Sequence, residues 1–132
     1  MPTNYVRLPL LSVFNVGYNR VEGSLPMFEN VARLAMYANS FSGSIPTEYG
    51  LLENLTRLEL DTNVDIIGSV PTELIECKKM TFLTLYKTGI SGSVSFCNSF
   101  GDDIDIRVSN VSMCGQECEC CCTENIFSNR HK

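Results

Sequence analysis

The chain has 132 residues and a formal net charge of −5 at pH 7, with 44% hydrophobic and 19% charged residues. This composition is typical of a folded globular domain and argues against a disordered chain. The acidic balance argues against nucleic acids and anionic membranes as partners, and no apolar run approaches the roughly 20 residues of a membrane-spanning helix.

The N-terminal segment, MPTNYVRLPLLSVF, has neither a basic region nor an uninterrupted apolar stretch, so it predicts no signal peptide. Beyond it, one phrase occurs four times, as GSLP, GSIP, GSVP and GSVS at 23–26, 43–46, 68–71 and 92–95. Each copy follows a segment that ends at Asn19, Asn39, Asn63 or Thr88. In each segment, apolar residues lie eight, five and three positions before this last residue. Because the two nearer apolar residues are two apart, they point to one face of a strand. We therefore expect short strands near residues 14–16, 34–36, 58–60 and 83–85.

The repeat unit recurs after 20, 24 and 25 residues, counted from Leu11 to Val31, Leu55 and Met80. Self-similarity at this period predicts a solenoid. The pattern L-x-x-L-x-L-x-x-N, followed by Gly-Ser-apolar-Pro, resembles the plant-type leucine-rich repeat over residues 5–97. The resemblance implies an α/β-type solenoid of about four coils, a right-handed superhelix. It has a parallel β-sheet on its concave face and an irregular or 3-10 helical convex side, and its strands should pair in chain order.

The residues that end the strands are expected to form a structural asparagine ladder. Asn19, Asn39 and Asn63 should lie inside the solenoid, where an amide can donate to and accept from backbone groups of its own and the adjacent coil. Thr88 can make only part of these hydrogen bonds. The first repeat is four residues short, and an extra residue between Asn63 and Gly68 predicts a small bulge.

The two ends of the repeat region differ. Tyr5 and Leu8 fall at the late apolar positions of a preceding repeat, so we expect an incomplete first coil and a longer repeat protein. Near the other end, Ile104, Ile106 and Val108 alternate with polar residues and predict a last strand.

Six of the seven cysteines crowd the C-terminal part of the chain. Such a cluster in a small chain favours disulfides and an oxidising compartment over a thiolate metal site, because adjacent cysteines cannot all point at one ion. It also resembles the cysteine-rich ends of secreted repeat proteins, which implies a cap at 98–124 before a disordered tail at 125–132. Cys77, at a leucine position, is expected to be reduced and buried. The disulfide candidates are Cys97, Cys114, Cys118, Cys120, Cys121 and Cys122.

Nothing in the sequence predicts catalysis, a cofactor or a metal site. The only histidine, His131, lies in the charged tail and forms no recognisable triad. The acidic run at 102–105 lacks the glycine and distal glutamate of a calcium-binding EF-hand loop, so a solvated turn is favoured. Asn54 and Asn110 begin N-x-S/T sequons and are glycosylation candidates.

Side chains between the buried leucines should align in columns on the concave face, the usual binding surface of a solenoid. Tyrosine and arginine often carry interface energy, although surface strands also favour β-formers such as tyrosine. We therefore expect an extracellular or cell-surface recognition module, receptor-like or inhibitor-like, that binds a protein, peptide or glycan. Its signal peptide would lie in a preceding part of the protein, and the alternative is a structural or adhesive surface protein without a dedicated ligand. The ligand-binding candidates are Arg33, Tyr37, Arg57, Glu59, Asp61 and Tyr86.

Overall fold

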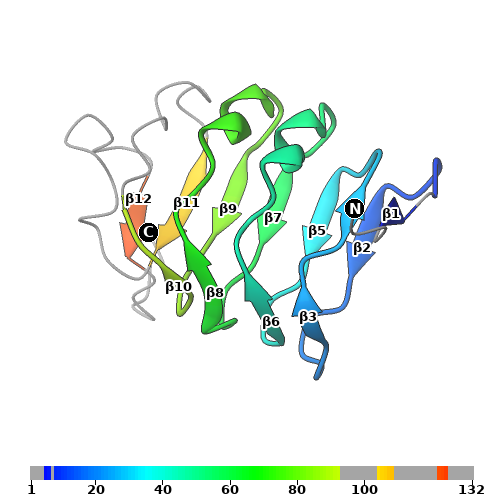
Figure 1. Ribbon diagram of the computed structural model, residues 1–132. Coiled ribbons are helices and arrows are strands. Elements are labelled where there is room, and N and C mark those ends of the chain that lie inside the picture. Colours follow the sequence, from blue (N-terminus) through cyan, green and yellow to red (C-terminus); the bar gives the residue numbers. More distant parts are fainter. Residues whose placement is uncertain (1–4, 7, 93–103, 109–121, 125–132) are drawn as a thin grey trace, which may run out of the picture.

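The computed structural model describes residues 5–6, 8–92, 104–108 and 122–124, and these form a solenoid (Figure 1). Successive coils each add one strand to a parallel sheet with the order β12-β11-β9-β7-β5-β2. The four strands predicted from the repeat are present and pair in chain order, each one residue earlier than expected. The strands of this six-stranded sheet are β2 (Val13–Asn15), β5 (Arg33–Ala35), β7 (Arg57–Glu59), β9 (Phe82–Thr84), β11 (Asp105–Val108) and β12 (Cys122–Glu124).

The register of the six-stranded sheet stacks equivalent residues of successive repeats directly on one another. Leu34 pairs with Leu58, and Leu58 pairs with Leu83. All three side chains have an exposed fraction of 0%. The predicted last strand is β11, whose Ile106 pairs with Leu83 and continues this buried row.

A second parallel sheet lies across the core from the first, where the resemblance implied only an irregular or 3-10 helical chain (Figure 1). Its order is β10-β8-β6-β3. One inward residue is buried on each of β6, β8 and β10, namely Phe41, Ile66 and Ile90. The strands are β3 (Glu22–Ser24), β6 (Ser40–Gly43), β8 (Asp65–Gly68) and β10 (Gly89–Ile90).

The repeated Gly-Ser phrase marks the point where the chain leaves this second sheet. Its glycines have φ angles between 83° and 99°, a region that side chains disfavour, so this exit from the sheet calls for glycine in every coil. The bend between the two sheets uses another left-handed residue, which is never glycine. The glycines are Gly23, Gly43, Gly68 and Gly92, and the bend residues are Tyr18, Ala38, Thr62 and Lys87.

The third side of the solenoid carries two short 3-10 helices, η1 (Thr47–Leu51) and η2 (Thr72–Glu76), each preceded by a proline. The helices pack closely, because a Cβ atom on Gly50 would lie 2.4 Å from the Glu73 carbonyl oxygen. The first repeat has no room for such a helix. Instead, β4 (Met27–Phe28) pairs in parallel with β1 (Tyr5–Val6).

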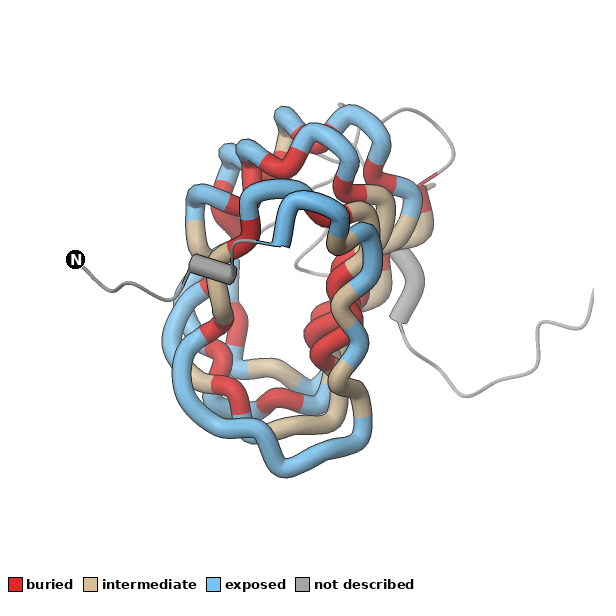
Figure 2. The backbone as a smooth tube through the Cα atoms, turned by 90° about the vertical axis from the view of Figure 1, so that its right-hand side faces the viewer, coloured by how far each residue is buried: buried red, intermediate tan, exposed pale blue. Residues whose placement is uncertain are grey.

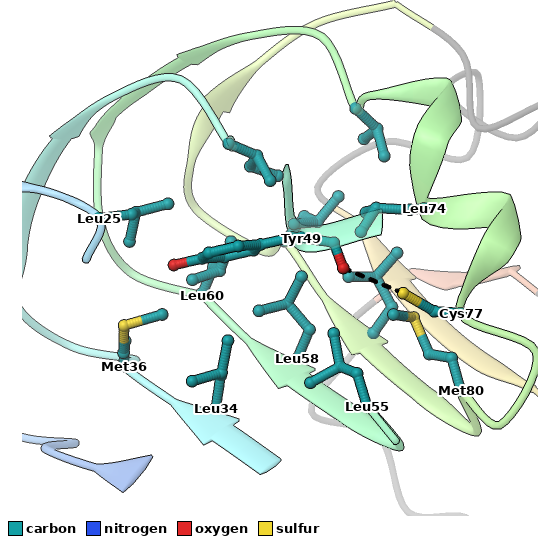
Figure 3. Packing of buried hydrophobic residues seen from close by; sticks show 14 of the residues in the cluster. Leu25, Leu34, Met36, Tyr49, Leu55, Leu58, Leu60, Leu74, Cys77 and Met80 are labelled. Atoms are coloured by element: carbon teal, nitrogen blue, oxygen red, sulfur yellow. Dashed lines mark hydrogen bonds between the residues drawn. The ribbon is translucent and has the colours of Figure 1, made fainter. Parts of the chain in front are cut away.

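The core is filled by stacked leucines and by two residues of less usual kind, Tyr49 and Cys77 (Figure 3). The Tyr49 hydroxyl donates to the Pro26 carbonyl oxygen at 2.8 Å, so this buried phenol is satisfied. The Cys77 thiol lies 3.2 Å from the Tyr49 carbonyl oxygen. Burial, assisted by Glu76, raises the pKa of Cys77 to about 11. Cys77 is therefore a buried free thiol, as predicted.

Asn63 connects two coils through its side-chain amide, which is fully buried. Its Nδ2 donates to the Leu60 carbonyl oxygen of its own coil at 2.8 Å and to the Met36 carbonyl oxygen of the preceding coil at 2.9 Å. Its Oδ1 accepts from the Phe41 amide at 3.0 Å. Asn39 makes the equivalent contacts with the first coil.

The other two bend positions make only part of this set. Asn19 was expected inside the solenoid, but it is exposed, and among the described residues its side-chain amide donates only within its own coil, to the Val16 and Gly17 carbonyl oxygens. The reason is that β2 is the edge of the described sheet, so no described coil covers Asn19. The Thr88 hydroxyl donates to the Leu85 carbonyl oxygen of its own coil at 2.8 Å, and none of its hydrogen bonds with described residues reaches the preceding coil.

The extra residue of the third repeat is taken up before β8 begins. Val64 lies in an exposed turn in which the Ile66 amide donates to the Asn63 carbonyl oxygen at 3.2 Å. In each case the glycine of one repeat pairs with the residue two positions before the glycine of the next repeat, Gly23 with Phe41 and Gly43 with Ile66. The insertion therefore leaves the register of the second sheet unchanged.

Several predictions concern residues outside the described part of the chain. These include the tail at 125–132, Asn110 and most of the cap at 98–124. Cys122 belongs to β12, of which only the backbone is described. In the described residues, no helix has the length and apolar character needed to cross a membrane. The disulfide candidates outside the described residues are Cys97, Cys114, Cys118, Cys120 and Cys121.

Candidate binding surface

The outward-facing side chains of the six-stranded sheet form three rows across the strands. Strand register fixes the first two rows, and inter-strand backbone hydrogen bonds just beyond the strands extend the alignment to the third. All six predicted ligand-binding residues lie in these rows. The first row is Val13, Arg33, Arg57, Phe82 and Asp105, the second is Asn15, Ala35, Glu59, Thr84 and Arg107, and the third is Gly17, Tyr37, Asp61 and Tyr86.

Glu59 lies beneath two arginines of the first row and is only 7% exposed. Its carboxylate accepts two hydrogen bonds from Arg33, at 2.7 and 3.2 Å, and a longer one from Arg57 at 3.5 Å. The bond to Glu59 raises the pKa of Arg33 above its ordinary value. Glu59 was predicted as a ligand contact, but its burial suits it to hold the two guanidinium groups in place.

Phe82 continues this contact network toward the C-terminal strands. The Arg57 guanidinium carbon lies 4.3 Å from the centre of the Phe82 ring, and that of Arg107 lies 4.9 Å from it. Arg107 also pairs with Asp105 at 2.9 Å within β11. Phe82, Asp105 and Arg107 were not among the predicted site residues. The alternation that predicted β11 could have placed Arg107 on this face, but not against Phe82.

Two tyrosines of the third row are half-buried and differ in their surroundings. The Tyr37 ring lies across Gly17, where an added Cβ atom would come within 2.4 Å of Tyr37 Cζ. Tyr18 meets the Tyr37 ring edge-on, with the ring centres 5.2 Å apart. On the far side, the Lys87 ammonium lies 5.3 Å from the Tyr86 ring centre. Glycine at position 17 is thus required for the position of Tyr37.

Asp61 is the third carboxylate of this surface and the one that differs from the others. Glu59 and Asp105 pair with arginines, whereas Asp61 forms no ion pair with any described residue. It is half-buried and hydrogen-bonds to Thr84. Burial is the main cause that raises the pKa of Asp61 above its ordinary value, and the charge of Glu59 adds to the effect.

Asn54, the glycosylation candidate within the described residues, is exposed at the turn that precedes β7. Its Nδ2 donates to the side chain of Asn30 at 3.1 Å, and its Oδ1 accepts from Lys79 at 2.6 Å. Its exposure is compatible with modification, which stays a prediction. In the described part of the chain, no group of three or more histidine, cysteine, aspartate and glutamate side chains is arranged to hold a metal ion.

No protein-family model and no curated protein matches this sequence. Solved structures do match. The Arabidopsis receptor kinase HAESA, in complex with the peptide hormone IDA and the co-receptor SERK1, has a TM-score of 0.65 and 24% identity, over 74% of this chain and 17% of that chain. The plant peptide hormone receptor RGFR1, in complex with RGF2, has a TM-score of 0.57 and 23% identity, over 74% of this chain and 20% of that chain. The chain thus spans at most a fifth of the length of these structures, and the likeness shows that its fold is a leucine-rich-repeat solenoid.

Proposed function

We propose that this chain is an extracellular or cell-surface recognition module that binds a protein, peptide or glycan through the three rows of the six-stranded sheet. An extended peptide is the favoured ligand. The observation that carries the proposal is the continuous contact network from Arg33 through Glu59, Arg57 and Phe82 to Arg107.

This network spans four strands and holds long side chains in fixed positions. A free arginine side chain loses rotamer entropy when it binds a partner, at a cost of about 0.5–1.5 kcal/mol per immobilised side chain. Arg33, Arg57 and Arg107 are restrained before binding by Glu59 and Phe82. A surface that served only to cover the core would gain little from such restraint.

The geometry of the rows favours an extended ligand. Neighbouring strands of a sheet lie about 4.8 Å apart, and the rows run across the strands, so a peptide laid along a row would meet a new side chain at every coil. Half-buried aromatic groups, Tyr37 and Tyr86, stand two strands apart in the third row. The similar solved structures, HAESA with IDA and RGFR1 with RGF2, are complexes with a peptide hormone and with RGF2. They support the choice of a peptide.

An extracellular setting would also account for the clustered cysteines and the two sequons. We propose at least two disulfides among the six C-terminal cysteines and a glycan at Asn54. Mass mapping of the unreduced protein tests both. Six free thiols, or a stoichiometric metal ion, would contradict the disulfides.

The binding proposal can be tested with a random peptide library displayed on phage and selected against the folded chain. For peptides that bind, Tyr37→Ala and Tyr86→Ala should each weaken the affinity by about 2 kcal/mol, or roughly 30-fold, as anchor residues do. Ser44→Ala and Ser69→Ala are matched controls, because both serines are exposed away from the six-stranded sheet.

Two outcomes would overturn the proposal. One is a set of peptides whose binding depends on the serines and not on the tyrosines. The other is the absence of any ligand, whether a library peptide or an arrayed glycan, that distinguishes the tyrosine variants from the unmodified chain. The second outcome would favour a structural or adhesive surface protein.

A further inference from the structure

We infer that the peptide bound by this surface contributes a basic group, either an arginine or lysine side chain or a terminal ammonium, to Asp61. This inference rests on the proposed function and adds the chemistry of the ligand. It follows from comparing the charged groups of the three rows and from the position of Asp61 among them.

Two arginines of the surface are already paired with carboxylates of the chain. Arg33 forms a two-bond pair with Glu59, and Arg107 pairs with Asp105 and stacks on Phe82. Arg57 stacks on Phe82 and has one long contact with Glu59, and its Nε atom is buried without a hydrogen-bond partner. A ligand anion would have to compete with the chain's carboxylates for Arg33 and Arg107. The charges of the rows therefore do not favour an acidic ligand.

Asp61 presents the opposite case. It forms no ion pair with a described residue, and Thr84, to which it hydrogen-bonds, is neutral. Partial burial removes water from this carboxylate, as the direction of its pKa shift also indicates. A partly desolvated charge without a counterion gains more from an incoming cation than a fully hydrated one does. The net charge of −5 would also attract a basic ligand over longer distances.

The groups around Asp61 suit a cation. Tyr86 follows Asp61 in the third row, and the Thr62 amide donates to the Tyr86 carbonyl oxygen at 2.7 Å, which fixes the two strands against each other. The Lys87 ammonium lies 5.3 Å from the centre of the Tyr86 ring, so a ligand cation would have to displace Lys87 in order to use this ring. Glu59 adds negative potential at Asp61, whereas Arg107 opposes it from β11. Arg107 is itself paired with Asp105, which reduces its opposition.

The test uses small probes on the full chain. N-acetyl-arginine N-methylamide carries the basic group, and N-acetyl-citrulline N-methylamide is its neutral counterpart of nearly the same shape. Both are titrated while the Asp61 carboxyl carbon and the Tyr86 ring signals are followed by NMR. The arginine probe should shift both signals with saturation, and the citrulline probe should bind about tenfold more weakly.

Variants separate the site from general attraction to an acidic protein. Asp61→Asn keeps the size of the side chain and should abolish the saturable shift of Tyr86 by the arginine probe. Glu22→Gln removes an exposed charge from β3 in the second sheet and should leave that shift unchanged. Equal binding of the two probes, or unchanged binding to Asp61→Asn, would overturn the inference.

The library selection distinguishes failure of this inference from failure of the proposed function. Selected peptides that depend on Tyr37 and Tyr86 but bind Asp61→Asn normally would disprove the inference and leave the proposed function standing. Saturable binding of the arginine probe at Asp61, with no selected peptide that depends on the tyrosines, would support a cation site at Asp61 and disprove the proposed function.

Discussion

The first and third repeats contain the same motif, but their equivalent residues have different environments. The Asn63 side chain is fully buried and bonded to two coils, whereas the Asn19 side chain is exposed and, among the described residues, bonded only to its own coil. Seen along the solenoid axis, the first coil is largely exposed and the coils behind it carry the buried positions (Figure 2). A motif residue therefore acquires its structural role from the coil that covers it.

The apolar residues show the same dependence on a covering coil. Leu58 and Leu60 of the third repeat are completely buried between neighbouring coils. Their counterparts in the first repeat, Phe14 and Val16, are only partly buried, and Tyr18 beside them is 81% exposed. In a solenoid each repeat is stabilised by its interfaces with its neighbours, so a repeat with only one complete neighbour in the described chain gains only part of that stabilisation.

The largest expected effect comes from removing the buried amide of the third repeat. Asn63→Ala deletes its bonds to Met36 and Leu60 and leaves the Phe41 amide without an acceptor. The free energy of unfolding should fall by about 3 kcal/mol, since buried groups without partners are costly. Urea denaturation followed by circular dichroism measures this change. A loss below about 1 kcal/mol would mean that water replaces the amide and that burial is not decisive.

A smaller gain is expected from restoring the amide in the fourth repeat. Thr88→Asn should reach back toward the Leu60 carbonyl oxygen, as Asn63 reaches the Met36 carbonyl oxygen. The added inter-coil hydrogen bond should stabilise the chain by about 1 kcal/mol. The same denaturation experiment applies, with Thr88→Val as the control that removes the existing bond. Destabilisation by asparagine would show that the fourth bend has a different geometry.

The free energy of unfolding should also depend on pH through Asp61 of the third repeat. The first repeat has no ionisable side chain at the equivalent position, which is Gly17. The pKa of Asp61 is raised in the folded chain above 3.8, so the unfolded chain gives up this proton more readily. Its contribution to stability is therefore greatest at low pH and is lost as the pH rises through the folded pKa. Asp61→Asn should raise the melting temperature slightly at pH 7 and have no such effect near pH 3. A lower melting temperature at pH 7 would indicate that Arg107 outweighs burial.

The smallest effect is expected at the exposed amide of the first repeat. Asn19→Ala removes two bonds within one coil, both at the surface, so the free energy of unfolding should change by less than about 0.5 kcal/mol. A loss as large as that of Asn63→Ala would break the comparison. It would mean that local bend geometry, and not the covering coil, determines the value of the asparagine.

The sequence was sufficient to predict the six-stranded sheet because its signal is local and repeated. Apolar spacing before Asn39, Asn63 and Thr88 located strands to within one residue, and the common period determined which strands pair. The second sheet was missed for the opposite reason. Its strands are short and contain residues such as Ser40 and Gly43, and only their backbone pairing with the next coil makes them strands.

The candidate site was predictable in position but not in contacts. Strand alternation correctly placed Arg33, Arg57 and Tyr37 on the outward face. It could not indicate that Glu59 is buried beneath arginines, or that Phe82 receives two guanidinium groups, because these depend on which rotamers neighbouring strands permit.

The two parallel sheets have a mechanical consequence. Inter-strand hydrogen bonds in both sheets run across the strands and hence along the solenoid axis. A force that pulls the coils apart along this axis would stretch these bonds directly, with successive interfaces loaded in series. Among the interfaces between the described repeats, the one between the third and fourth coils should give way first, because there the Thr88 side chain forms no hydrogen bond with a described residue of the preceding coil. The solenoid would then extend in steps, one coil at a time, and the identity of residue 88 would determine which step comes first.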